Sequence, residues 1–187
     1  MEDKIKSMIQ SSIDAKQGIP VDQIMKACDK IKACYQGHGK ILVCGNGGSF
    51  ADAQHMAAEF ENRFKRERKP FPCLALGTNA STLTSIGNDY SFEEIFSKQV
   101  EAYGRGGDVF IGISTSGNAK NVVRAAQAAR ANGLYVVGLL GRDGGQLKEH
   151  CDLSIIVPVQ ETARIQESHI LIIHIICEIL DEMLASH

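Results

Sequence analysis

The sequence contains no tryptophan, and aromatic residues make up only 6% of its 187 positions. Proteins that bind single-stranded nucleic acid usually stack the bases on aromatic rings, so this composition disfavours that class. The formal net charge of −2 also lacks the basic excess that a general binder of phosphate backbones carries. Nucleic acid is therefore not the expected partner.

Long hydrophobic runs are absent as well. The most apolar stretch, ILIIHIICEIL at 170–180, is interrupted by His174 and Glu178 and is too short and too polar to span a bilayer. The N-terminal segment MEDKIKSMIQ has mixed charges and no apolar core, so secretion is disfavoured. The six cysteines form no C-x-x-C pair. We expect them to be buried, reduced thiols in a cytoplasmic protein, not zinc ligands or a disulfide framework.

Apolar segments with β-branched residues alternate with helical patterns along the chain. We predict helices at 2–17, 21–36, 50–64, 81–87, 92–102, 119–132 and 162–185, and strands at 40–44, 72–76, 108–113, 134–140 and 153–158. The predicted fold class is α/β, with a single doubly wound, five-stranded parallel sheet covered by helices on both faces. We expect one domain over 1–187, with an N-terminal helical extension at 1–37 and an α/β core with a long C-terminal helix at 38–187.

Two loops that follow predicted strands are rich in glycine and hydroxyl groups. GNGGS at 45–49 opens a helix, where free backbone amides and the helix dipole favour an anion. It is not a G-x-G-x-x-G motif, because Phe50 occupies the sixth position, and no G-K-[ST] follows. The second loop, STSGN at 114–118, offers several hydroxyls where one would suffice to cap a helix.

Ligands of a doubly wound sheet bind beyond the carboxyl ends of the strands, where these two loops belong. Several hydroxyls and free amides suit a phosphate without any lysine or arginine. Each loop taken alone also fits a plain strand-to-helix connection. Together, on neighbouring strands, they favour a sugar phosphate over a nucleotide.

The helix predicted after the first loop carries His55, Glu59 and Arg63 at four-residue steps, so the three share one face. Alone, Glu59 and Arg63 would form an ordinary surface ion pair, but beside the loop this face can look into the anion site. The charge cluster NRFKRERKP at 62–70 is interpreted as a solvated helix end and loop. On the last helix, His174 lies about two turns after Gln166, within LIIHIIC, where a histidine is usually a satisfied core group.

The motifs GNGGS, DAQH, AAEF, IGNDY, GDVFIGISTSGN and ARIQESHILIIH, in this order and spacing, resemble those of the phosphoheptose isomerases of the sugar isomerase (SIS) domain superfamily. The resemblance extends from about residue 38 to residue 180. It implies interconversion of sedoheptulose 7-phosphate and D-glycero-D-manno-heptose 7-phosphate, a first step toward bacterial surface heptose. It also implies a homotetramer with one bound zinc ion per subunit.

The resemblance assigns roles residue by residue. Glu59 is the expected proton-abstracting base and His174 the second acid/base. The implied zinc ligands are His55, Glu59, Gln166 and His174, and the donor set suits zinc. The implied substrate contacts are Asn46, Gly47, Gly48, Glu59 and Gln166, with Asn88 and Asp89 on the sugar hydroxyls and Ser49, Ser114, Thr115 and Ser116 around the phosphate. By itself, GNDY at 87–90 fits a helix end with Gly87 and Asn88 as stop signals.

The sequence departs from the family pattern at two places. Ala119 replaces a serine that members often have, and Asn79 stands where many relatives have an acidic residue. The apolar last helix has more hydrophobic surface than a small sheet can cover, so we expect it to pack against a neighbouring subunit together with the N-terminal helices.

Two alternative functions are compatible with the same predicted sheet. One is a non-catalytic SIS protein that binds a partner, but those relatives lack the histidine of the final helix. The other is a different sugar-phosphate enzyme, such as an etherase or an amino-sugar isomerase, and those lack the combined DAQH and RIQE-x-H pattern.

Overall fold

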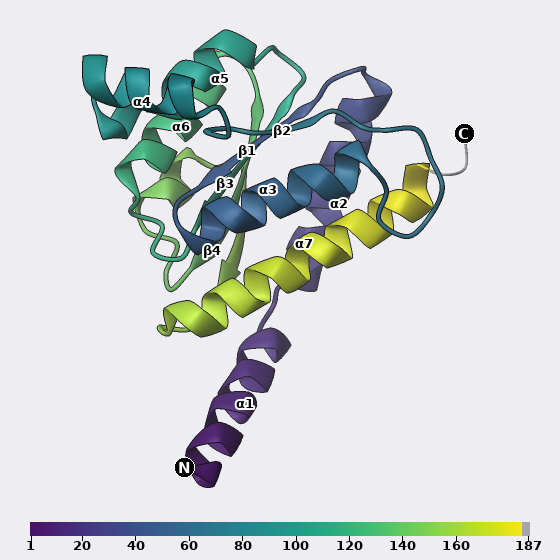
Figure 1. The fold of residues 1–187 in the computed structure, drawn as a ribbon. Helices are drawn as coiled ribbons and strands as arrows, with labels where there is room; N and C mark the ends of the chain where they lie inside the picture. Colours follow the sequence, from purple (N-terminus) through teal and green to yellow (C-terminus); the bar gives the residue numbers. More distant parts are fainter. Residues whose placement is uncertain (185–187) are drawn as a thin grey trace.

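Five parallel strands form the centre of the computed structural model, which describes residues 1–184 (Figure 1). The strands are β1 (Ile41–Gly45), β2 (Cys73–Ala75), β3 (Val109–Ser114), β4 (Tyr135–Gly141) and β5 (Leu153–Val157). Their order is β2-β1-β3-β4-β5, so the predicted parallel sheet is confirmed. The order of the strands reverses between β1 and β3, which pair from Ile41 opposite Val109 to Gly45 opposite Ile113. Such a switch point opens a crevice at the carboxyl ends of the two strands.

Helices cover both faces of this sheet (Figure 1). They are α1 (Glu2–Gln17), α2 (Val21–Gln36), α3 (Gly48–Glu61), α4 (Ala80–Asp89), α5 (Ser97–Tyr103), α6 (Lys120–Ala131) and α7 (Thr162–Leu184), with short 3₁₀ helices η1 (Phe92–Glu94) and η2 (Gln146–His150). Neighbouring strand residues point to opposite faces. Ile41 and Val43 therefore pack with α2, α3 and α7, whereas Leu42 and Cys44 pack with α5 and α6.

Some predicted boundaries are wrong. Helix α3 ends at Glu61, so Arg63 does not continue the face of His55 and Glu59; it pairs instead with Glu67 at 3.3 Å. Helix α4 runs through Gly87 to Asp89, past the predicted stop signals, and 3₁₀ helix η2 was not predicted. Residue 185, the predicted end of the last helix, lies outside the described residues.

The predicted solvated loop at 62–70 is wrong at one position. The Arg68 side chain is only 4% exposed and is paired with Asp181 of α7. Asn79, one of the departures from the family pattern, is the N-cap of α4, and its Oδ1 accepts a hydrogen bond from the Thr82 amide at 3.1 Å. Since asparagine and aspartate cap helices equally well, this departure leaves the fold unaffected.

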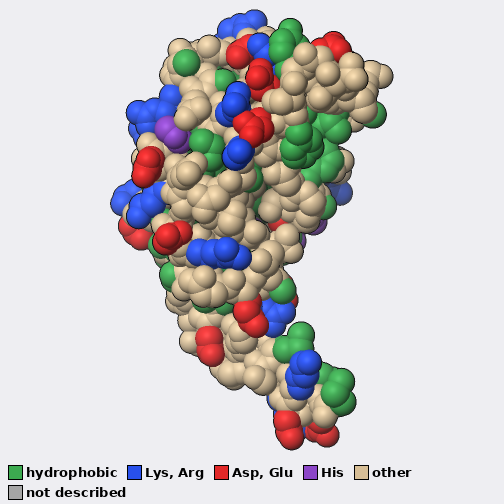
Figure 2. Space-filling view, turned by 90° about the vertical axis from the view of Figure 1, so that its left-hand side faces the viewer, with side chains coloured by type: hydrophobic (Ala, Val, Ile, Leu, Met, Phe, Trp, Pro, Cys, Tyr) green, Lys and Arg blue, Asp and Glu red, His purple; other side chains and the backbone are tan. Residues whose placement is uncertain are grey.

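Helix α1 projects away from the sheet and carries the N-terminus (Figure 1). The Arg164 side chain of α7 donates a hydrogen bond to the carbonyl oxygen of Met8 in α1 at 2.7 Å. Ala15 is the only buried residue of α1 among those described. Hydrophobic side chains lie open to solvent along it, as the narrow end of the molecule in Figure 2 shows; they are Ile5, Met8, Ile9 and Ile13. Within residues 1–184, no helix is both long enough and apolar enough to cross a membrane.

Asp108 ties the starts of β1 and β3 together. This buried carboxylate accepts hydrogen bonds from the Lys40 amide at 3.0 Å and the Arg105 amide at 2.9 Å, and the Lys40 ammonium lies 2.6 Å away. It thus satisfies two backbone donors that flank the two strands bearing the glycine and hydroxyl loops.

We expect Asp108→Ala to lower the free energy of unfolding by about 2–4 kcal/mol, because it leaves two amides and a charge without their partner. Urea unfolding measures this loss. Asp22→Ala is the matched control, since its ion pair with Lys26 is exposed and should contribute little to the free energy of unfolding. Equal losses in the two variants would contradict the role of Asp108.

Candidate active site

The two loops singled out in the sequence meet at the carboxyl ends of β1 and β3. Between them lies a cavity of about 200 Å³ at the point where the strand order reverses. Its lining residues are Asn46, Ser49, Ile113, Ser114, Thr115, Ser116 and Ala119. All four hydroxyls predicted around a phosphate therefore face one small space.

The STSGN loop at 114–118 is stabilised by hydrogen bonds from its own backbone amides. The Ser114 hydroxyl accepts a hydrogen bond from the Gly117 amide at 3.0 Å, and the Ser116 hydroxyl accepts one from the Asn118 amide at 3.2 Å. A hydroxyl that accepts in this way still has its own proton to donate. Gly117 has a φ of +65°, and a Cβ on it would overlap the carbonyl oxygen of Gly144. The close crossing of these two loops therefore requires glycine.

Asn46 does not point freely into the cavity. Its side-chain amide forms a reciprocal pair with Asn121 of α6, with N···O distances of 2.8 and 2.9 Å. Asn121 is buried and was not predicted as a site residue. Its position shortly after the STSGN loop is the only signal that the sequence contains. The pair fastens the first loop to the helix that follows the second.

Gln166 reaches from α7 to the glycine loop. A Cβ built on Gly48 would lie 2.5 Å from Gln166 Nε2, so the amide rests directly against the start of α3. Gly47, with a φ of +56°, is the N-cap of the same helix. Gly47 therefore permits the turn before α3, and Gly48 permits the close approach of Gln166.

His55, Glu59 and His174 come together where α3 packs against α7. His55 Nε2 lies 3.0 Å from Glu59 Oε1, and the rings of His55 and His174 are 5.1 Å apart, edge to face. The side chains of His55 and Glu59 are 45% and 22% exposed, so a small molecule can reach them. The His174 ring also stacks on that of Phe64, with ring centroids 5.5 Å apart.

The two histidines of α7 differ in environment. His169 is fully buried and its Nε2 donates to the Leu140 carbonyl at 3.0 Å; burial lowers its pKa to about 4. His174 is only half-buried and faces His55. His169 is thus a core histidine, although its buried Nδ1 makes no hydrogen bond within the described residues. An apolar context would also suggest this role for His174.

Asp52 is a second carboxylate on α3, one turn before His55. Its Oδ2 is buried and makes no hydrogen bond within the described residues. Burial raises the pKa of this carboxyl, while His55 nearby acts in the opposite direction. Asp52 begins the DAQH motif, but no role was predicted for it from the sequence.

Asn88 and Asp89 do not join the cavity in the single chain. They lie exposed at the end of α4, where the Asn88 amide donates to Asp89 Oδ1 at 2.9 Å. Helix α4 buries none of its residues within the described chain.

The donors of the predicted zinc set are two imidazoles, one carboxylate and one amide, carried by α3 and α7. These ligand types suit zinc, and His55, Glu59 and His174 lie side by side. As they stand, residues 1–184 contain no group of three His, Cys, Asp or Glu side chains gathered at metal-binding distances.

Comparison with known proteins places the chain among close relatives. The SIS domain family model matches residues 5–141. A phosphoheptose isomerase of Clostridium acetobutylicum is 48% identical over 98% of this chain and 96% of its own. The structure of a phosphoheptose isomerase from Neisseria gonorrhoeae has a TM-score of 0.91 at 45% identity, covering 97% of this chain and 98% of the other. One from Francisella tularensis has a TM-score of 0.92 at 40% identity, covering 96% and 97%.

Ala119 has two places in this site. It lines the cavity, and it is the N-cap of α6, where it makes no side-chain hydrogen bond. A hydroxyl at this position could accept from the first amides of the helix and donate its proton to an anion.

We expect Ala119→Ser to raise the free energy of unfolding by about 0.5–1 kcal/mol through the helix cap. It should also tighten binding of inorganic phosphate by about fivefold or less, because other hydroxyls already supply donors. Urea unfolding and calorimetric titration with phosphate measure the two effects, with Ala102→Ser on the exposed face of α5 as control. Weaker phosphate binding would mean that the anion does not occupy this cavity.

Proposed function

The chain belongs to the phosphoheptose isomerases of the SIS domain family, and we propose from this premise that it interconverts sedoheptulose 7-phosphate and D-glycero-D-manno-heptose 7-phosphate. The observation that carries the proposal is the cluster of His55, Glu59 and His174 on α3 and α7. Ser49 of α3 lines the phosphate-sized cavity, and Gln166 of α7 rests on Gly48 next to it. Such a reaction places the enzyme at the start of bacterial heptose biosynthesis.

The chemistry moves a carbonyl between C2 and C1 of the sugar. Glu59 takes a proton from C1 of the ketose, and the electron pair of that C–H bond forms the C1=C2 bond of an enediolate with the charge on O2. A proton delivered to C2 and the transfer of the O1 proton to O2 then give the aldose. His174 is the second acid/base and carries the proton that Glu59 does not.

The surrounding residues orient these two groups. When Glu59 is ionised it can only accept, so His55 Nε2 must donate in their 3.0 Å contact and fixes the direction of the carboxylate. Ser49, Ser114, Thr115 and Ser116, with the amides of Gly47 and Gly48, hold the phosphate away from the bond changes. Gln166, resting on Gly48, joins this anchor to the reacting end. Asn88 and Asp89 are proposed contacts of the sugar hydroxyls.

Zinc is the proposed cofactor, held by His55, Glu59, Gln166 and His174. When bound, zinc would polarise the carbonyl and enediolate oxygens. The support for it is the chemistry of these donors and their convergence from α3 and α7.

A homotetramer is the proposed assembly. The exposed apolar side of α1 and a cavity of about 280 Å³ between α2 and α7 offer surface that copies of the chain can cover. The cavity is lined by Lys16, Gln17, Ile19, Val21, Ile24, Met25, Leu171, Ile175 and Ile179. Burial of these side chains is favourable at about 25 cal/mol per Å². A cytoplasmic location is part of the same proposal, and the six free cysteines suit it.

We expect Glu59→Gln and His174→Gln each to lower kcat by about 10²–10⁴-fold, the usual contribution of a positioned acid or base. Binding of the sugar phosphate should persist, since the cavity residues are unchanged. Conversion of sedoheptulose 7-phosphate followed by NMR measures turnover, and Glu61→Gln, an exposed neighbour on α3, is the control. Substantial turnover by the His174 variant would favour a different acid/base, and no turnover by the unaltered protein would favour a non-catalytic sugar-phosphate binder.

Metal content and activity should rise together. Chelation should lower turnover, and added zinc should restore it. His55→Ala should reduce the bound metal in elemental analysis while the melting temperature stays near that of the unaltered protein, because the His55 side chain is 45% exposed. His150→Ala, on η2 outside the cluster, serves as the control. A fully active preparation without metal would refute the zinc proposal and limit His55 to orienting Glu59.

A further inference from the structure

A buried ion pair connects the loop after α3 to the end of α7. Arg68 Nε lies 2.6 Å from Asp181 Oδ1, and their side chains are only 4% and 1% exposed. Burying a charged pair is costly, and in some proteins a buried pair serves to fix a particular arrangement. The surroundings of this pair show which arrangement is fixed.

The Arg68 guanidinium also closes the end of α3. Its Nη2 donates to the carbonyl oxygen of Glu59 at 2.9 Å, and its Nη1 donates to that of Phe60 at 3.0 Å. The last carbonyls of a helix have no partner within the helix, so these bonds fix where α3 ends and how it lies. One of the two bonds is made to the backbone of the proposed base itself.

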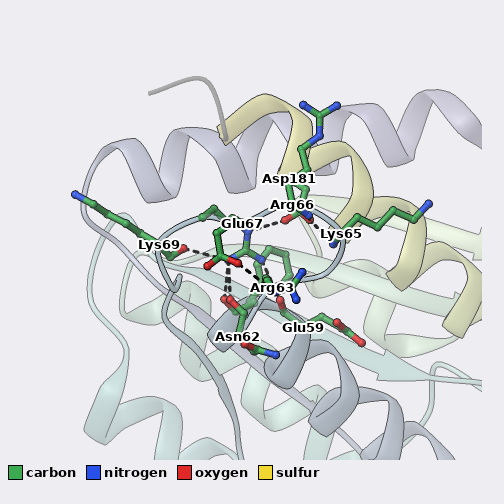
Figure 3. Close-up of polar contacts among 10 residues, drawn as sticks. Glu59, Asn62, Arg63, Lys65, Arg66, Glu67, Lys69 and Asp181 are labelled. Carbon is green, nitrogen blue, oxygen red and sulfur yellow. Dashed lines mark hydrogen bonds and ion pairs between the residues drawn. The ribbon is translucent and has the colours of Figure 1, made fainter.

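The other oxygen of Asp181 holds the loop. Asp181 Oδ2 accepts from the backbone amides of Lys65 at 2.7 Å and Arg66 at 3.0 Å, and Figure 3 shows the carboxylate on α7 facing these two residues. The residue immediately before them is Phe64, whose ring stacks on His174. Asp181 lies seven residues, about two turns, after His174 on the same helix.

The buried Arg68–Asp181 ion pair therefore contacts the backbone of Glu59 directly and is linked to His174 through the loop that carries Phe64. We infer that Arg68 and Asp181 are positioning residues: together they set the placement of Glu59 at the end of α3 and of the Phe64 ring against His174. This inference rests on the proposed function of Glu59 and His174.

Two exposed ion pairs offer a comparison within the same loop and helix. Lys65 pairs with Glu178 at 2.6 Å and Arg66 with Glu182 at 3.5 Å, and all four side chains are about half exposed. They tether the loop to α7 without touching a carbonyl of α3. Burial alone would raise the pKa of the Asp181 carboxyl, but hydrogen bonds from Arg66, Lys65 and Arg68 outweigh it and hold the pKa below its usual range. Asp181 is thus charged at neutral pH.

The test compares Asp181→Asn with Glu178→Gln as the matched control. We expect Asp181→Asn to lower kcat by about 10–100-fold with a change of less than about threefold in KM, because small misplacements reduce turnover while the distant phosphate loops are unchanged. The ring-proton NMR signals of His174, assigned with His174→Gln, should shift as Phe64 moves. Glu178→Gln should alter neither kcat nor these signals.

Three further variants test the inference if Asp181→Asn does not fold. Phe64→Leu leaves the ion pair intact and removes only the stacked ring, and should lower kcat and shift the His174 signals. Arg68→Lys keeps the charge but not the forked donors, and should retain more activity than Arg68→Gln. Folded Asp181→Asn or Phe64→Leu protein with unaltered kcat and His174 signals would overturn the inference while leaving the proposed function intact. An unaltered protein without turnover of sedoheptulose 7-phosphate would refute the proposed function instead.

Discussion

The parallel pairing of β1 with β3 is the constraint on which the rest of the structure depends. These strands are adjacent in the sheet but are separated in the chain by α3, β2, α4, η1 and α5. Only this pairing brings the glycine loop after β1 beside the hydroxyl loop after β3. The same pairing directs α3 back across the sheet, where it meets α7 and places His55 beside His174. The cavity between the two loops and the contact of His55 with His174 thus both follow from the pairing of β1 with β3.

The site divides into a rigid part and an adjustable part. The anchoring loops are constrained by the backbone: Gly117 crosses Gly144, and Gln166 rests on Gly48 without room for a methyl group. A loop already held in its binding conformation loses little entropy when an anion arrives. The proposed acid/base groups instead depend on side chains from two helices and a charged loop. Their geometry follows from packing that a single substitution can change.

Local patterns were sufficient to predict most of the fold. The boundaries of α1 and α2 agree with the spacing of Ile, Met and Ala, and the strands agree within one or two residues, because burial on both faces demands continuous apolar runs. The sequence-based prediction failed at positions whose environment depends on contacts between residues far apart in the chain. Arg68 looks like any member of a charge cluster until Asp181, 113 residues later, is placed beside it. His169 and His174 lie on the same helix, and only the packing of α7 against β4 and α3 separates the core residue from the proposed site residue.

The reciprocal amide pair of Asn46 and Asn121 limits how such a chain can diverge. Each side chain both donates and accepts, so the two are matched in polarity as well as in shape. Aspartate at either position would place two oxygen acceptors opposite each other at a partly buried position. Leucine would leave one donor and one acceptor without a hydrogen-bond partner. A lineage that changed one residue would come under pressure to change the other. The two positions, 75 apart in the sequence, should therefore be inherited as a unit.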